Sequence, residues 1–277
     1  RIEKGWLDYN GKPLFSAELG EAQLYRDNHS KGPKFPMDWT LSGVGFLMSN
    51  KDNTLLTAFK QRFERLYVIR IRPEEMADES RSDASRPQQS LENFADWYRH
   101  LSLAMPDKLQ KLISDLQLRL PGLKRLRFQD AGDGKILYVD YEAGRADEAS
   151  FRFTRLSDGQ KALIGLYTIL HTLNSKEGVT LCIDEPENYL ALPEIQPWID
   201  EVTELQELGI HHSSVQILMI SHHPRLINFL ANDQGIWMER KDGTGPTRTH
   251  IVAEDSKENR LSISDLVERG WIYEPVE

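Results

Sequence analysis

The sequence contains few of the features that mark secreted or membrane proteins. Its 277 residues include one cysteine, Cys182, and no apolar run that approaches the roughly 20 residues needed to cross a bilayer. A single cysteine excludes an internal disulfide framework and a cysteine-based metal cluster, and such scarcity is typical of a reducing compartment. We therefore expect a cytoplasmic protein that works without a membrane. Cys182 itself lies in an apolar run and is expected to be inert.

Positive charge is scarce relative to negative charge, since 34 Lys and Arg residues face 43 Asp and Glu residues and the formal net charge is −9. This balance argues against a surface that binds nucleic acid over its whole extent. A basic cluster near a predicted hairpin comprises Arg119, Lys124, Arg125 and Arg127. We interpret the cluster as a solvated strand face and keep direct DNA binding as a weaker hypothesis.

A phosphate-binding loop is also missing, because the pattern G-x-x-x-x-G-K-[ST] occurs nowhere in the 277 residues. Residues 132–135 (Gly-Asp-Gly-Lys) lack a following Ser or Thr and predict a turn instead. The chain begins with Arg1 and not with Met. We therefore expect a preceding N-terminal segment that carries such a loop.

The apolar pattern divides the chain into four parts. Residues 1–72 predict mixed α/β structure, in which the helix 54–66 precedes the strand 67–71. Residues 73–90 contain almost no apolar side chain, which predicts an exposed linker or a disordered loop. Residues 91–120 show helical apolar spacing and predict a helical insert of two helices.

The fourth part, residues 121–277, begins with alternating strands around Asp133-Gly134, which is a strong hairpin signal. Further along, a helix is predicted at 159–173. Apolar strands follow at 179–183 and 215–220, with a polar helix between them. Buried strands that alternate with helices predict a parallel sheet.

Two carboxylates, Asp184 and Glu185, follow directly after the apolar strand 179–183. Ligands bind where the strands of a parallel sheet end. One carboxylate at that edge can hold a hydrated Mg²⁺ ion, and the next can orient or deprotonate an attacking water. For this motif alone, an acidic turn after a strand is an equally good interpretation.

Residues 156–160 (Leu-Ser-Asp-Gly-Gln) stand just before the predicted helix. Ser157 is a good N-cap residue, and a helix N-terminus presents free N–H groups to an anion. Gly159 permits the close approach of a phosphate. Taken alone, the segment also fits a plain helix cap.

A histidine follows the second apolar strand, where Ser221 precedes His222 and His223. At the edge of a sheet, an imidazole can hydrogen-bond a γ-phosphate and its attacking water. By itself, either histidine is more often a surface or core residue.

Residues 156–160, 181–186 and 220–223 occur in one order and together resemble the signature motif, the Walker B motif and the switch histidine of an ABC-type ATPase of the SMC/RecF-like AAA class. The first motif differs at one position from the Leu-Ser-Gly-Gly-Gln of that class. The resemblance covers residues 150–240. Residues 188–193 depart from the usual D-loop pattern, so no D-loop residue is assigned.

The resemblance implies an α/β fold: a P-loop NTPase head of the ABC type, with a parallel sheet core, antiparallel β elements and a helical insert. It also implies ATP and Mg²⁺ as cofactors and a head-to-tail homodimer with ATP at its interface. In that arrangement Asp184 holds Mg²⁺, Glu185 is the catalytic base and His222 senses the γ-phosphate. The residues that bind the partner's ATP are Ser157, Gly159 and Gln160.

Standalone bacterial ATPases of this class serve DNA repair or anti-phage defence, often with a nuclease or toxin partner. The resemblance therefore implies an ATP-hydrolysing domain whose dimerisation regulates a DNA-directed or effector partner. Two alternatives stay open: a nucleotide-independent scaffold or interaction module, and a DNA-repair ATPase of the RecF-like type. The presence of both Glu185 and His222 favours a working ATPase over a scaffold.

Overall fold

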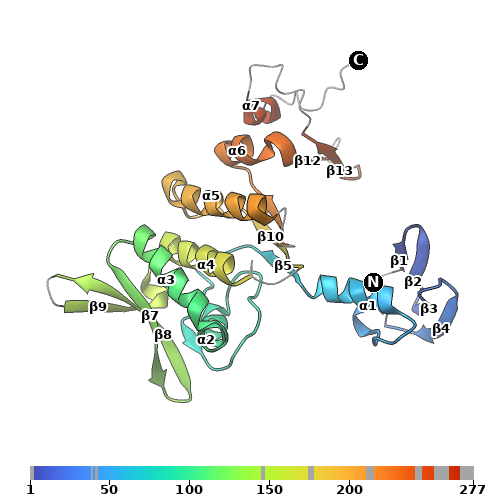
Figure 1. The fold of residues 1–277 in the computed structure, drawn as a ribbon, viewed down its shortest axis with the longest axis horizontal. Coiled ribbons are helices and arrows are strands. Elements are labelled where there is room, and N and C mark those ends of the chain that lie inside the picture. Colours follow the sequence, from blue (N-terminus) through green and yellow to red (C-terminus); the bar gives the residue numbers. More distant parts are fainter. Residues whose placement is uncertain are drawn as a thin grey trace. The chain divides into compact units, whose positions relative to one another are not determined.

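The computed structural model describes residues 3–38, 40, 43–144, 147–173, 178–209, 215–240, 245–252 and 262–268. The chain divides into two compact units, whose elements are labelled in Figure 1. Unit 1 comprises Arg1–Tyr67 with Lys176–Thr180 and Ser214–Gln216. Unit 2 comprises Val68–Ser175, Leu181–Ser213 and Ile217–Glu277. Asp184, Glu185, His222 and the residues of the Leu-Ser-Asp-Gly-Gln motif all belong to unit 2.

Unit 1 contains an antiparallel meander that the apolar pattern did not predict. Its strands pair in chain order, and they are β1 (Lys4–Tyr9), β2 (Lys12–Glu18), β3 (Glu21–Tyr25) and β4 (Lys31–Pro36). The first turn is formed by Asn10 and Gly11, with φ of 50° and 74°. Positive φ at both positions is the conformation of a two-residue hairpin turn, for which Asn-Gly is the preferred sequence. The Asn10-Gly11 dipeptide was therefore a sequence signal from which the first hairpin could have been predicted.

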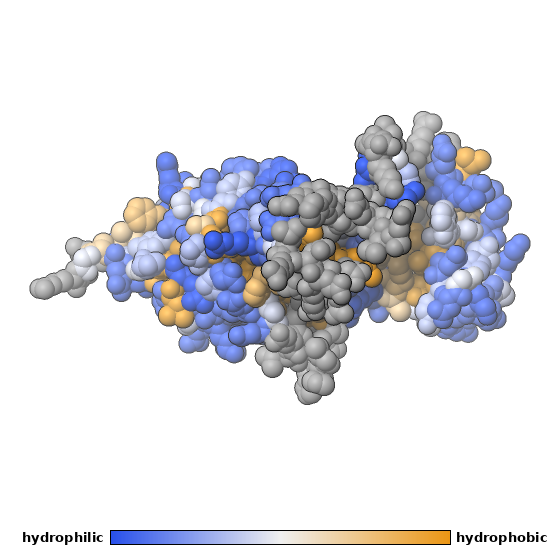
Figure 2. Space-filling view, turned by 90° about the horizontal axis from the view of Figure 1, so that it is seen from above, coloured by the Kyte–Doolittle hydropathy of each residue, from blue (hydrophilic) through white to orange (hydrophobic). Residues whose placement is uncertain are grey.

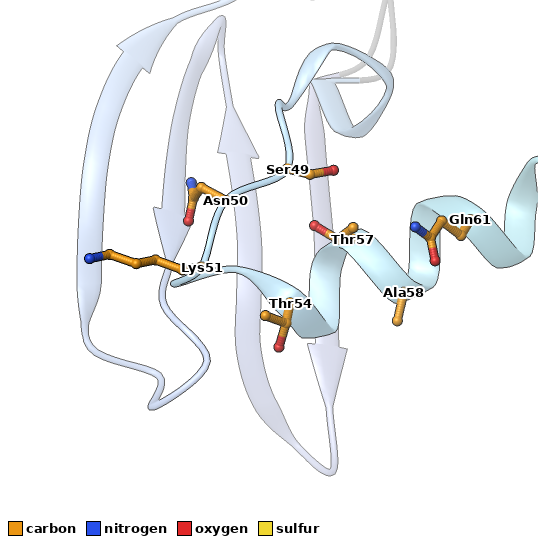
Figure 3. A pocket seen from close by; sticks show the side chains of 7 residues that line it. All are labelled: Ser49, Asn50, Lys51, Thr54, Thr57, Ala58 and Gln61. Carbon is orange, nitrogen blue, oxygen red and sulfur yellow. The ribbon is translucent and has the colours of Figure 1, made fainter.

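The helix predicted at 54–66 is confirmed as α1 (Thr54–Phe63), whose Leu56 packs into the core of the meander. The carboxylate of Asp27 caps its start, accepting hydrogen bonds from the backbone N–H groups of Thr54 (2.8 Å) and Leu55 (3.0 Å). These hydrogen bonds lower the pKa of Asp27, and the bond from Leu55 has the largest effect. A shallow hollow beside the helix is shown in Figure 3, lined by Ser49, Asn50, Lys51, Thr54, Thr57, Ala58 and Gln61. Because Asp27 already satisfies the first N–H groups, we do not assign the hollow to an anion.

A three-stranded sheet has the order β11-β10-β5, where β5 is Leu66–Ile69, β10 is Thr180–Asp184 and β11 is Gln216–Ile220. Along β10 and β11, the N–H of Gln216 donates to Val179 (2.9 Å) and the N–H of Glu185 donates to Ile220 (2.8 Å). The paired residue numbers rise together, so the strands are parallel. This confirms the predicted parallel sheet. Cys182 lies half-buried on β10, and burial raises the pKa of its thiol, as fits an inert side chain.

Four helices of unit 2 are labelled in Figure 1: α2 (Phe94–Ala104), α3 (Pro106–Arg119), α4 (Asp158–Leu173) and α5 (Leu192–Gly209). The first two are the two helices predicted within residues 91–120. Helix α4 is buried over most of its surface and packs against both α3 and α5. Trp198 on α5 is fully buried, and its indole N–H donates to the carbonyl of Leu166 on α4 (3.1 Å).

An antiparallel sheet in unit 2 contains the predicted hairpin. Its strands are β6 (Glu79–Ser80), β7 (Leu123–Ala131), β8 (Gly134–Ala143) and β9 (Asp147–Arg152), and β8 pairs with each of the others. The basic cluster is largely paired with carboxylates here. Arg125 and Arg127 both donate to the buried Asp140 at 2.8 Å, and Lys124 contacts Glu148 at 3.2 Å. These contacts agree with a structural interpretation of the cluster.

The segment 73–90 differs from the exposed linker that its composition predicts. Met76, Asp78 and Ser80 are buried within it. The carboxylate of Asp78 pairs with the guanidinium of Arg152 at 2.8 Å and accepts a hydrogen bond from the hydroxyl of Thr154. Because these partners satisfy the charge, a segment with few apolar residues packs against the sheet.

The last described elements are α6 (Pro224–Gln234), the antiparallel pair β12 (Ile236–Glu239) and β13 (Arg248–Ile251), and α7 (Ile263–Glu268). Within the described ranges, no helix is long and apolar enough to cross a membrane. The face seen in Figure 2 is mostly hydrophilic, with small separate hydrophobic areas. That surface agrees with a composition in which 28% of residues are charged.

Candidate functional site

The acidic pair lies where the parallel strands end. Asp184 is the last residue of β10, and Glu185 follows it with a φ of 49°. A positive φ is uncommon for a residue other than glycine and often marks a functional position. The neighbouring strand holds this conformation, because the N–H of Glu185 donates to the carbonyl of Ile220 at the end of β11. The backbone of Glu185, and with it the origin of its side chain, is therefore held by β10 and β11 together.

Arg70, which follows β5, bridges the two carboxylates. Its guanidinium nitrogens lie 3.3 Å from Oδ2 of Asp184 and 2.9 Å from Oε2 of Glu185. The amide of Asn188 donates to the same Glu185 oxygen at 2.8 Å. These contacts compensate part of the negative charge and orient the Glu185 side chain. The sequence prediction placed Arg70 inside a strand and gave it no role.

The structure separates the two histidines that follow β11. Nε2 of His222 lies 3.9 Å from Oε1 of Glu185, and the His222 side chain is 84% exposed. His223 instead caps α6, where its Nδ1 accepts a hydrogen bond from the N–H of Arg225 at 3.3 Å. His222 is therefore the histidine whose imidazole is exposed beside the acidic pair.

The Leu-Ser-Asp-Gly-Gln motif forms the start of α4. The hydroxyl of Ser157 accepts a hydrogen bond from the N–H of Gln160 (3.3 Å), and Oε1 of Gln160 accepts one from the N–H of Ser157 (3.0 Å). This reciprocal pair is a capping box, which confirms the N-cap predicted for Ser157. The amide of Gln160 also donates to the hydroxyl of Tyr141 at 3.3 Å.

Gly159 lies against the turn that follows the acidic pair. A Cβ atom added at Gly159 would meet the carbonyl oxygen of Tyr189 at 2.9 Å and Cδ2 of Leu190 at 3.7 Å. Tyr189 has a φ of 70°, and its hydroxyl contacts Glu74 at 3.4 Å. The start of α4 and the turn after Glu185 are therefore in backbone contact. This contact was not predicted, because residues 188–193 match no usual D-loop pattern and no residue there was assigned a role.

We expect Gly159→Ala to destabilise unit 2 by about 1–3 kcal/mol, because the methyl group overlaps the Tyr189 carbonyl and the turn must shift. Urea unfolding monitored by circular dichroism measures the change. Gly45→Ala is the matched control, since a Cβ there meets nothing within 4 Å. Equal effects of the two substitutions would contradict the close approach at Gly159.

Residues 49–228 match the family "AAA domain, putative AbiEii toxin, Type IV TA system". The match covers well over half of the chain, and the chain therefore belongs to this AAA family. No protein with a curated description matches it. Family membership confirms the resemblance to an ABC/SMC-like AAA ATPase. It also agrees with the fold class, an α/β head with a parallel sheet core and antiparallel elements.

Among solved structures, the chain is similar to one described as "Structural biochemistry of ATP-driven dimerization and DNA stimulated activation of SMC ATPases", at 16% identity and a TM-score of 0.42, over 64% of this chain and 99% of that one. It is also similar to the Smc head domain with a coiled coil and joint from Pyrococcus yayanosii, at 17% identity and a TM-score of 0.42. That match covers 65% of this chain and 32% of the other.

Proposed function

We propose that the chain is an ATP-binding and ATP-hydrolysing domain whose catalytic centre lies at the ends of β10 and β11. The observation that carries the proposal is the convergence of Asp184, Glu185 and His222 at one edge of a parallel sheet in a member of an AAA family. ATP binding also needs a phosphate loop, which the 277 residues do not contain. We propose that this loop comes from outside these residues.

The donor set fits a hydrated Mg²⁺ ion. Asp184 supplies hard carboxylate oxygens at a strand end, and its side chain is 28% exposed. Asp184 would hold the ion, which neutralises charge on the phosphates of bound ATP. Magnesium bound here would compete with Arg70 for the same carboxylate. Arg70 would then remain as the partner of Glu185.

Glu185 is the proposed general base. Its Oε2 is held by Arg70 and Asn188, while its Oε1 faces His222. A carboxylate fixed at one oxygen can orient a water molecule with the other and accept a proton from it. The exposed imidazole of His222 would hydrogen-bond the γ-phosphate and its attacking water.

Ser157, Gly159 and Gln160 would contribute to nucleotide binding across a head-to-tail homodimer. The N-terminus of α4 offers backbone N–H groups to the ATP of the partner protomer. ATP then favours the closed dimer and hydrolysis favours the open one, as a shift of populations. We propose a role beside a toxin or nuclease effector, in anti-phage defence or DNA-directed work. The family description refers to a putative AbiEii toxin and a type IV TA system, and it supports the toxin context. We place this activity in the cytoplasm.

We expect Ser157→Arg to abolish ATP-dependent dimerisation, because a long cation at the start of α4 obstructs the interface. Analytical ultracentrifugation with ATP and Mg²⁺ measures the monomer–dimer ratio. Ser114→Arg is the control, since Ser114 is an exposed serine on α3. Dimers that persist in Ser157→Arg would count against the proposed signature role.

The scaffold hypothesis has one observation in its favour, namely that Arg70 contacts both Asp184 and Glu185. A nucleotide-independent module could keep such a pair as a structural ion bridge. Isothermal titration with ATP and Mg²⁺, on protein expressed from its complete reading frame, separates the two functions. Saturable binding that Asp184→Asn weakens supports the ATPase, and absence of binding supports the scaffold.

A further inference from the structure

Three helices of unit 2 each contribute one side chain that can bind a metal ion, and the three side chains lie close together. Asp115 lies on α3, His171 on α4 and Glu201 on α5, and one ligand atom from each lies within 4.8 Å of the others. None of the three takes part in the proposed nucleotide centre. We infer that Asp115, His171 and Glu201 form a binding site for a divalent transition metal of the zinc type.

The geometry at His171 distinguishes this cluster from an ordinary ion pair. Its Nε2 lies 2.7 Å from Oδ2 of Asp115, yet this buried nitrogen makes no aligned hydrogen bond within the part of the chain that the structure describes. A neutral imidazole has a lone pair that can ligate a metal. Ligands bound to one zinc ion lie about 2.0–2.2 Å from it, so small rotations of the three side chains suffice to enclose one.

Outer contacts already hold one of the carboxylates. Oε1 of Glu201 accepts hydrogen bonds from the guanidinium of Arg119 (3.1 Å) and the hydroxyl of Tyr167 (3.4 Å), and Arg119 also donates to that hydroxyl (3.0 Å). These contacts leave the second Glu201 oxygen for a metal. Ligating carboxylates in proteins are commonly oriented by such outer hydrogen bonds.

The burial of the cluster suits a metal that enters from solvent. The exposed fractions of the His171, Asp115 and Glu201 side chains are 15%, 33% and 32%. One imidazole and two carboxylates are the nitrogen and oxygen ligands that zinc accepts, with a fourth position left for water. A bound ion would link the helical insert to α4, whose first turn carries the signature residues.

The test uses the full chain, freed of metal by a chelator and titrated with Zn²⁺ in excess Mg²⁺ and without nucleotide. We expect one equivalent of Zn²⁺ to bind, and the affinity to fall about 100-fold or more in His171→Ala, since loss of even an outer contact weakens metal sites by 10- to 100-fold. Co²⁺ in place of zinc gives a visible absorption band when an imidazole and carboxylates enclose it, and this band should disappear in the same variant.

Asp115→Asn keeps the shape of the side chain and repeats the test if His171→Ala fails to fold, as judged by circular dichroism. His100→Ala, which removes an imidazole from α2, is the control and should retain the affinity. Wild-type protein that binds no zinc, or wild-type affinity for zinc in folded His171→Ala or Asp115→Asn, would overturn the inference. These outcomes are independent of the ATPase proposal, because no nucleotide is present.

Discussion

Replacing Glu185 by Gln is expected to lower the rate of ATP hydrolysis by about 100- to 10,000-fold while ATP binding is retained, because a positioned general base contributes a factor of this size. Gln keeps the length of the side chain and can still bond to Arg70 or Asn188, so the site should stay assembled. Steady-state phosphate release and equilibrium nucleotide binding measure the two effects. Both measurements use protein expressed from its complete reading frame.

The same variant should accumulate as the ATP-bound dimer, because dimer opening depends on hydrolysis. Glu194→Gln is the matched control. Glu194 accepts a hydrogen bond from the N–H of Ala191 at the start of α5, and Gln preserves that acceptor. Hydrolysis by Glu185→Gln at the wild-type rate would remove Glu185 from the catalytic role.

Asp78→Asn is expected to reduce the free energy of unfolding by about 2–3 kcal/mol at pH 7, because hydrogen bonds to a charged group are worth about 1.5–3 kcal/mol and Asp78 is buried. The carboxylate accepts two bonds from Arg152 and one from the hydroxyl of Thr154. An amide replaces one of the acceptor oxygens by a donor that faces the guanidinium. Urea unfolding at pH 7 measures the loss.

The loss should depend on pH. Burial acts to raise the pKa of Asp78, but the hydrogen bonds from Arg152 and Thr154 outweigh it, and the pKa is lowered from its ordinary value of 3.8. The carboxylate therefore stabilises the fold fully above the unfolded-state pKa, and this stabilisation is lost as pH falls through the lower folded-state pKa. The difference between wild type and Asp78→Asn should shrink below about pH 4.

Asp133→Asn is the control for this effect, because Asp133 occupies a hairpin turn where Asn is equally tolerated. A difference between wild type and Asp78→Asn that stays constant from pH 7 to pH 3 would contradict the role assigned to the charge.

Apolar patterns were sufficient to predict two parallel strands and one buried helix, although β11 is less buried than its apolar sequence predicts, with Leu218 and Ile220 44% and 47% exposed. The parallel strands β10 and β11 and the helix α4 are long apolar patterns, and each lies close to its predicted bounds. The meander β1 to β4 escaped prediction because its strands are short, and β1 and β4 contain no buried residue. The segment 73–90 was misjudged because polar groups such as Asp78 can be buried when they are paired.

The candidate site also contains residues that could be predicted from the sequence and one residue that could not. Asp184 and Glu185 were predictable because an apolar strand ends abruptly in two charges, and His222 because it follows the next such strand. Arg70 could not be assigned from the sequence, since its role depends on β5 being the neighbour of β10. Non-local pairing determines that order, and the spacing of residues within one segment contains no information on it.

The measurement that tests the central proposal most directly is the release of phosphate from ATP by the unmodified protein, expressed from its complete reading frame, with and without Mg²⁺. We expect Mg²⁺-dependent hydrolysis that saturates with ATP. Absence of hydrolysis at saturating ATP, in protein shown to bind the nucleotide, would contradict the assignment of Asp184, Glu185 and His222 as a catalytic centre.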